Sequence, residues 1–321
     1  MDATFHAVQR RLAGILPAGA QAVSDTPLEH LTLGTVDPPR LISASVLEGK
    51  ALTAHPVEGD PVARFVAFLD GTQTSRVAAH ADGVPVVHGT VAAVVRQRVE
   101  RRMRTWGAPR LERRLYAPLA QLPAEFRKGL GDAGIAVVDT LEGRKVDSLH
   151  PFALQDAAIH AVQEDREALE RELAESWCAD ASGEVLVDGS ITGSERVATS
   201  DCAVGMVKSH RTLYAEGQAL RAILQLPRAH RSSVFRVTSP KRTPVASWYL
   251  RMRDPAGHDP LWGLVRIEVA DTLTGKALAR RANEVSLWVL AEALPLATPD
   301  SRWDKMVYGI RDCEEFLRAI Q

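Results

Sequence analysis

Two short apolar segments of the sequence each end in an Asp-Gly pair that is followed by a hydroxyl residue. Residues 185–187 precede Asp188, and residues 65–69 precede Asp70 in the same way. A continuous apolar run indicates a strand covered on both faces, and Asp-Gly is typical turn chemistry after it. Ligands bind beyond the carboxyl ends of such strands, so two carboxylates there could share a divalent metal. The alternative is two unrelated hairpin turns.

A lysine follows the next predicted strand. Residues 203–207 form a second apolar segment that leads directly to Lys208. With this strand beside the one that ends at Asp188, a carboxylate and an ammonium group would face one cleft. The alternative for Lys208 is a solvated residue at the edge of the sheet.

The most regular helix is expected over residues 151–177. Proline suits its first position, and apolar residues recur on one stripe between positions 158 and 173. At about 100° per residue, Glu170 lies beside one edge of that stripe and Glu172 lies at the other. Glu170 is therefore the first candidate for a third carboxylate in the cleft, and Glu172 is the second. The alternative for either glutamate is a solvated position on a charged helix.

A basic segment runs from residue 96 to residue 116 and contains eight arginines, with Trp106 and Tyr116 among them. Arginines contact phosphates and aromatic rings stack on bases, so this segment could bind nucleic acid. The residues nominated for that role are Arg96, Arg98, Arg101, Arg102 and Trp106. The alternative, with equal weight, is a solvated face on which Glu100 and Glu112 act as counterions.

Composition and charge describe an ordinary globular chain. Its 321 residues are 45% hydrophobic, with a formal net charge of −1 at pH 7. No apolar run is long enough to span a membrane and no signal-peptide core is present, so we expect a cytoplasmic protein without a membrane partner. Cys178, Cys202 and Cys313 have no C-x-x-C spacing, which argues against a disulfide framework or zinc site and favours buried thiols.

Periodicity and turn signals predict the other elements. Helices are expected over residues 5–16, 215–226 and 275–290 and in the tail, and strands over 83–95, 245–252 and 261–269. The alternation in 261–269 predicts one covered face and one polar face. Residues 1–60 are assigned as an N-terminal arm and residues 61–321 as one domain.

Several of these motifs, taken in order, resemble the NurA nuclease family. The motifs are Phe-Leu-Asp70-Gly-Thr, an R-x-x-x-E helix with Arg166 and Glu170, Leu-Val-Asp188-Gly-Ser, Val-Gly-Met-Val-Lys208-Ser, Trp-Tyr249-Leu-Arg251 and Gly-Leu-Val-Arg266-Ile-Glu268. The resemblance runs from about residue 60 to the C-terminus, and the shared order of the motifs carries it.

The resemblance implies an α/β fold with an RNase H-like core, in which a mixed β-sheet flanked by helices is elaborated by extra strands. It implies a Mn²⁺- or Mg²⁺-dependent deoxyribonuclease, usually a homodimer, that degrades single-stranded DNA from 5′ to 3′ and often cuts internally. Members of the family commonly work with HerA, a hexameric DNA-translocating ATPase, in DNA-end resection and repair. Relatives of the pair serve in phage defence.

The resemblance also assigns residues. Asp70, Glu170 and Asp188 match the acidic metal ligands of the family, and Lys208 matches the lysine after the second Asp-Gly. Carboxylate oxygens suit Mn²⁺ or Mg²⁺, and the lysine would balance charge on the reacting phosphate. The residues of matching motifs that join the predicted nucleic-acid contacts are Tyr249, Arg251 and Arg266.

The tail departs from the family pattern. Many members have a Tyr-Pro motif followed by a histidine that completes the metal site, whereas here Tyr308 precedes Gly309 and no histidine follows. Glu314 occupies that neighbourhood and could ligate the metal. The missing histidine favours a rival hypothesis, a catalytically weak or inactive DNA-binding subunit that docks on the ATPase and regulates it. The acidic trio favours the nuclease.

Overall fold

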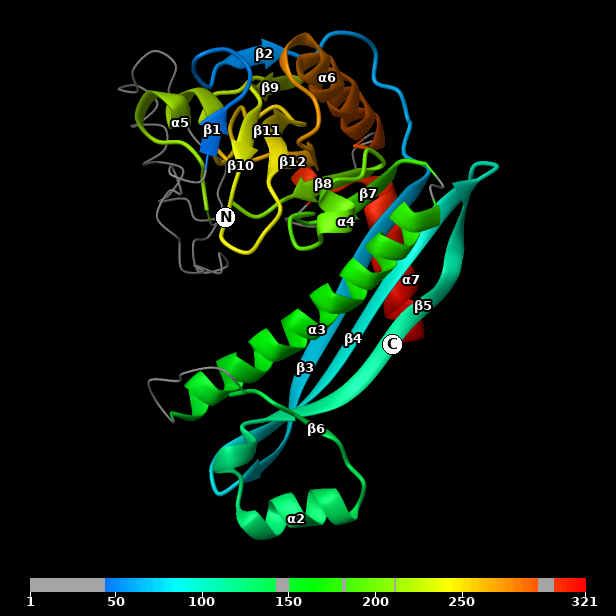
Figure 1. Ribbon diagram of the computed structural model, residues 1–321, viewed down its shortest axis with the longest axis vertical. Coiled ribbons are helices and arrows are strands. Elements are labelled where there is room, and N and C mark those ends of the chain that lie inside the picture. The colour runs from blue at the N-terminus through cyan, green and yellow to red at the C-terminus, as the bar shows by residue number, and fades with distance from the viewer. Residues whose placement is uncertain (1–43, 143–149, 181–182, 211, 294–302) are drawn as a thin grey trace, which may run out of the picture. The chain divides into compact units, whose positions relative to one another are not determined.

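The computed structural model describes residues 44–142, 150–180, 183–210, 212–293 and 303–321. The fold is α/β, with a large mixed sheet flanked by helices, as expected (Figure 1). The chain divides into unit 1, residues 1–64 with 205–307, and unit 2, residues 65–204 with 308–321. Each unit therefore combines segments that are distant in the sequence. The helix expected over residues 5–16 lies outside the described residues.

Unit 2 is built on strands in the order β7-β3-β4-β5-β6. Their bounds are β3 Ala67–Ala81, β4 Val84–Val99, β5 Arg102–Ala117, β6 Val137–Asp139 and β7 Val185–Asp188. The central long strand β4 is antiparallel to both β3 and β5, β7 runs parallel to β3, and β6 runs parallel to β5. Glu100 and Arg101 make the turn between β4 and β5 with positive φ angles of 50° and 66°.

The first Asp-Gly pair does not end its strand, which corrects the expected turn. β3 continues through Asp70 and Gly71, which pair with Val94 and Ala93 of β4. A turn signal in the sequence is local, whereas the ladder with β4 supplies hydrogen bonds to the backbone of both residues. The second pair behaves as expected, because β7 ends at Asp188.

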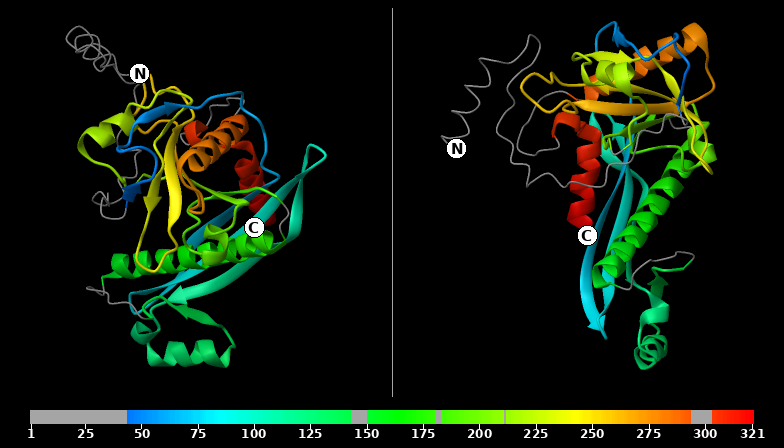
Figure 2. Two further views of the ribbon diagram at one scale, coloured as in Figure 1. Left: turned by 45° about the horizontal axis from the view of Figure 1, so that its top comes forward. Right: turned by 90° about the vertical axis from the view of Figure 1, so that its left-hand side faces the viewer.

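Two helices cover opposite faces of the long strands of unit 2, α3 (Pro151–Asp180) and α7 (Tyr308–Ile320) (Figure 2). Successive residues of a strand point to opposite faces. Thr72 accordingly accepts a hydrogen bond from Gln321, just beyond α7, while Gln73 accepts one from Arg166 of α3. The shorter helices of this unit are η3 (Leu119–Gln121), α2 (Ala124–Asp132) and α4 (Glu195–Ala198).

Unit 1 contains an antiparallel run in the order β1-β10-β11-β12-β8, with β2 paired to β9 and β9 to β11. The bounds are β1 Ala44–Val46, β2 Ala54–Pro56, β8 Ala203–Val207, β9 His230–Ser232, β10 Phe235–Val237, β11 Val245–Arg251 and β12 Leu264–Ala270. Its helices are α5 (Gly217–Leu224), α6 (Gly275–Glu292) and the short η4 (Trp303–Lys305). β8 crosses the boundary between the units, and its residues 205–207 pair with β12.

The polar face expected on residues 261–269 is absent from β12, because every residue of that strand is buried. Arg266 and Glu268 occupy the polar positions of the alternation, and their side chains form an ion pair at 2.5 Å. Mutual neutralisation allows both charges to be buried. The alternating sequence therefore correctly distinguished an apolar face from a polar face, but it did not show that the polar face is buried.

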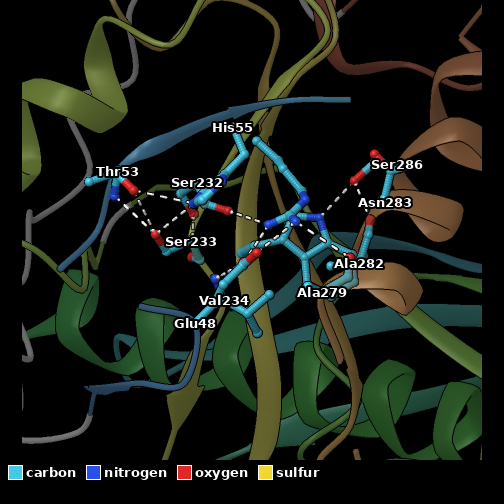
Figure 3. A network of polar contacts seen from close by, with 12 residues as sticks. Glu48, Thr53, His55, Ser232, Ser233, Val234, Ala279, Ala282, Asn283 and Ser286 are labelled. Carbon is cyan, nitrogen blue, oxygen red and sulfur yellow. Dashed lines mark hydrogen bonds and ion pairs between the residues drawn. The ribbon is translucent and has the colours of Figure 1, made fainter. Parts of the chain in front are cut away.

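A polar network anchors the first described segment of unit 1 to β9 and the residues after it (Figure 3). Arg231 donates to both carboxylate oxygens of Glu48, at 2.6 and 2.9 Å. The Ser233 hydroxyl lies 3.0 Å from Nε2 of His55 and 3.1 Å from the Thr53 hydroxyl. These contacts supply hydrogen bonds to the buried residues Arg231 and Ser233.

Among the described residues, no helix combines the length and the apolar character that crossing a membrane requires.

Candidate metal centre

The parallel pairing of β3 with β7 brings the two Asp-Gly motifs together. Phe68 pairs with Leu186 and Leu69 with Val187, so Asp70 and Asp188 follow at the next position of the two strands. The apolar residues before each aspartate are buried and hold the strands in the core. The shared sequence motif thus corresponds to a shared place in the sheet.

The third carboxylate of this cluster belongs to Glu314. Carboxylate oxygens of Asp70, Asp188 and Glu314 all lie within 4.8 Å of one another. We call these three residues the acidic cluster. The sequence predicts Glu170 as the third ligand and indicates Glu314 only by its place in the tail, where the resembled family has a histidine.

Close packing against β3 fixes the helix that carries Glu314. Gly309, in the first turn of α7, lies against the ring of Phe68, and a Cβ at this position would come within 2.2 Å of that ring. One helical turn later, the buried thiol of Cys313 donates to the Phe68 carbonyl at 3.4 Å. Only glycine allows this approach, and Glu314 follows directly after Cys313.

Arg96 provides a second anchor for α7. Its Nε donates to Asp312 at 2.6 Å, its other nitrogens donate to the Thr105 hydroxyl and the Met103 carbonyl, and its guanidinium stacks over Phe316. The basic segment predicts a nucleic-acid contact for Arg96. In the structure its donors are directed at the protein, where they hold α7 against β4.

Glu170 approaches the same region from α3. A Cβ at Gly71 would come within 2.3 Å of Oε1 of Glu170, so a glycine is required beneath this carboxylate. The same Oε1 accepts a hydrogen bond from Arg166 at 2.8 Å. Burial raises the pKa of Glu170 to about 7, with Arg166 opposing the shift and the charge of Asp188 adding to it.

The acidic cluster fits a hard divalent cation. Oxygen ligands bind Mg²⁺ or Ca²⁺ at about 2.0–2.6 Å, so two ligands of one ion can be up to about 5 Å apart. The 4.8 Å limit on the cluster lies within that span. Carboxylates this close repel one another unless a cation or a proton neutralises them. The donor set contains only carboxylate oxygens, which suits Mg²⁺ or Mn²⁺ and disfavours softer metals.

Three of the predicted nucleic-acid contacts lie in the interior of unit 1. Tyr249 accepts a hydrogen bond at its hydroxyl from the backbone of Tyr214, and Arg266 pairs with Glu268. Arg251 is fully buried and donates only to backbone carbonyls. All three side chains therefore contribute to the core rather than to a surface of the described chain.

The other predicted contacts lie on β4, β5 and the turn between them. Arg101 and Arg102 are exposed. Arg98 is half-buried, donates to the Phe65 carbonyl at 3.2 Å and stacks over Phe68. The half-buried Trp106 packs edge-on against Trp177 of α3. A nucleic-acid contact stays a prediction for these residues.

Lys208 directly follows β8 and belongs to unit 1, whereas the acidic cluster and Glu170 belong to unit 2. Its catalytic role also stays a prediction.

Comparison of the chain with protein-family models gives no match, and comparison with curated proteins gives none either.

Proposed function

We propose that this protein is a nuclease that hydrolyses DNA phosphodiester bonds with the help of Mn²⁺ or Mg²⁺. The observation that carries the proposal is the convergence of Asp70, Asp188 and Glu314. The order of motifs that resembles the NurA family supports the same activity, together with an RNase H-like core. We further propose a homodimer that acts with a HerA-type ATPase on single-stranded DNA, in DNA-end processing or phage defence.

The three members of the acidic cluster would hold the metal. A bound divalent ion polarises a phosphate oxygen and lowers the pKa of a bound water, which is the chemistry that phosphodiester hydrolysis needs. Asp70 and Asp188 come from adjacent strands of a packed sheet, so their separation is fixed by the backbone. Glu314 depends on the docking of α7, which makes that helix part of the site.

Glu170 would hold and move a proton on the α3 side of β3, within reach of the charge of Asp188. Its Oε1 accepts the hydrogen bond of Arg166, which leaves Oε2 as the oxygen that carries the proton. A pKa of about 7 allows this carboxyl group to take up and release a proton near neutral pH. Arg166 also donates to Gln73 at 3.0 Å, so it positions Glu170 against β3.

The test is degradation of single-stranded DNA labelled at the 5′ or the 3′ end, with Mn²⁺ or Mg²⁺ and with EDTA. We expect degradation that EDTA abolishes and that Asp188→Asn reduces by about 10²-fold or more, the scale seen when an electrostatic group of an active site is removed. The end label that is released first gives the polarity. Calorimetric titration with Mn²⁺ on wild type and Asp188→Asn measures ion binding apart from turnover.

A matched pair of variants on α7 isolates the third ligand. Glu314→Gln should reduce degradation as strongly as Asp188→Asn. Glu315→Gln is the control, because Glu315 is the next residue of the same helix, is 58% exposed and pairs only with Arg311 among the contacts described. Equal activity of the two variants would remove Glu314 from the site.

If the wild-type protein does not degrade DNA even with divalent ions and the ATPase partner present, the nuclease proposal is wrong. If such a protein still binds DNA, the regulatory subunit becomes the better hypothesis. Activity that resists EDTA would instead overturn the role of the metal.

A further inference from the structure

Two cysteines that are far apart in the sequence meet in unit 2. Cys178 lies in the last turn of α3, and Cys202 immediately precedes β8. Their sulfur atoms are 3.7 Å apart across 24 residues of sequence. A disulfide bond is about 2.05 Å long, so the sulfurs would need to approach by less than about 2 Å. Both residues are only half-buried, which leaves them open to small reagents.

Contacts on both sides hold this pair together. The carbonyl of Cys202 accepts a hydrogen bond from the backbone of Val185 at 2.9 Å, which ties it to the start of β7. The indole of Trp177, next to Cys178, donates to the Gly183 carbonyl at 2.8 Å and ties the end of α3 to the segment before β7. Because the backbone of Cys202 is bonded to β7 and the side chain beside Cys178 is bonded to the segment before β7, the proximity of the thiols is a property of the fold.

The two thiols differ in acidity. The hydrogen bond with Cys178 lowers the pKa of Cys202 to about 6, burial opposes this shift, and the Ser200 hydroxyl 3.1 Å away adds to it. The same S–H···S contact, followed by burial, raises the pKa of Cys178. Thiolates are the reactive form, so we assign Cys202 as the nucleophile of the pair and Cys178 as the second thiol.

We propose that Cys178 and Cys202 form a site of reversible oxidation, in which a hydroperoxide converts the two thiols into an intramolecular disulfide. The Cys202 sulfur attacks the terminal peroxide oxygen, the O–O bond breaks, and an alcohol or water leaves with a proton. The resulting sulfenic acid is attacked by the Cys178 sulfur, the S–S bond forms, the S–O bond breaks and water leaves. Two thiols lose two electrons and two protons in total, and the peroxide is reduced.

Cys313 is an internal reference for this chemistry. It is fully buried, and its S–H donates to the Phe68 carbonyl. A buried thiol of this kind is inert towards reagents in solution. The folded chain should therefore keep one free thiol after mild oxidation, and that thiol should be Cys313.

The experiment treats the reduced, folded full chain with a small excess of hydrogen peroxide, then unfolds it and alkylates the remaining thiols. We expect intact mass to show one alkylated thiol and the loss of two hydrogens, peptide mapping to show a link between Cys178 and Cys202, and dithiothreitol to restore all three thiols. Three alkylated thiols, links between chains, or loss of Cys313 at the same rate would overturn the proposal.

Two variants test the order of the steps. Cys178→Ser removes the second thiol, so the sulfenic acid at Cys202 should accumulate and be trapped by a cyclic 1,3-diketone. Cys202→Ser removes the nucleophile, so Cys178 should stay reduced under the same treatment. Equal trapping at both single cysteines would refute the assigned roles. The wild-type mapping remains decisive for the disulfide even if a variant fails to fold.

Discussion

The arginines buried in unit 1 and the carboxylates of the acidic cluster in unit 2 lie in different electrostatic surroundings. Arg251 is surrounded by backbone carbonyls, and Arg266 is paired with Glu268. In unit 2 the carboxylates of the acidic cluster converge on one another, and the raised pKa of Glu170 reflects its burial beside Asp188. In unit 1 each of these arginines faces groups of opposite polarity. In unit 2 three carboxylates gather together, although Arg166 pairs with Glu170 and Arg318 pairs with Glu314 at 3.3 Å.

The charges of the first kind stabilise the folded state, whereas those of the second kind lower its stability. A buried ion pair or a guanidinium bound to carbonyls is strongly disrupted when one partner is removed, because the other is left uncompensated. Carboxylates gathered together repel, and neutralising one of them relieves the repulsion. Removing one charge should therefore destabilise unit 1 and relieve repulsion in unit 2.

The largest expected effect is the destabilisation of unit 1 by Arg251→Met. The guanidinium donates to the carbonyls of Leu224, Leu226, Pro260 and Trp262. Each buried carbonyl left without a donor costs about 1–3 kcal/mol, so the total is roughly 5 kcal/mol or more. Urea unfolding monitored by circular dichroism measures it. The exposed Arg101→Met is the control and should change stability by less than about 0.5 kcal/mol.

Glu268→Gln should destabilise unit 1 by about 3–5 kcal/mol, because it leaves the positive charge of Arg266 buried without its partner. The free energy of unfolding in urea at pH 8 is the measurement. The double variant with Arg266→Met should recover part of the loss. A single variant as stable as wild type would show that this pair does not behave as a buried ion pair.

Divalent ions should stabilise unit 2 through the acidic cluster. An ion that binds only the folded state at a concentration of 100 times its Kd adds about 2.7 kcal/mol. We expect Mn²⁺ to raise the midpoint of thermal unfolding of wild type, and Asp188→Asn to lose this response. In EDTA the variant should be at least as stable as wild type, because it removes one of the repelling charges. An equal response to Mn²⁺ in both proteins would place the ion elsewhere.

Glu170→Gln should gain about 3 kcal/mol at pH 8 in EDTA, because the pKa of this carboxyl group is about 7 in the folded state against 4.5 in the unfolded chain. The folded carboxyl keeps its proton to higher pH than the unfolded one, so wild type loses stability as pH rises from about 4.5 to about 7. Gln cannot ionise and avoids this loss. The two proteins should converge near pH 4, and urea unfolding across this range checks it.

Local signals in the sequence predicted most of the strands and helices of both units. Apolar runs located β7 and β8, and the apolar stripe located α3, because periodicity and length suffice for such elements. The turn expected at Asp70 was wrong, since only the pairing of β3 with β4 shows that the strand continues. Motifs also placed Arg251 among the nucleic-acid contacts, and the sequence does not state that this charge is buried.

The candidate site also contains residues that the sequence predicts and residues that only the structure shows. Asp70 and Asp188 were found because each carries its own motif, and their adjacency followed from the parallel register. Glu314 has no motif around it. Its place depends on Gly309 fitting over Phe68 and on Arg96 holding Asp312, which are contacts between residues far apart in the chain. Spacing along the sequence carries no information about them.

The path of the chain between the units determines the order in which the parts of unit 2 become available during synthesis. The chain enters unit 2 at Phe65, leaves it after Val204 and returns only at Tyr308. Cys313, beside Glu314, bonds to Phe68 across 245 residues of sequence. Domains fold as the ribosome releases them, and contacts of such long range form late. A nascent chain that ends before α7 holds two of the three carboxylates, so the proposed nuclease would acquire its metal centre only after unit 1 has been synthesised.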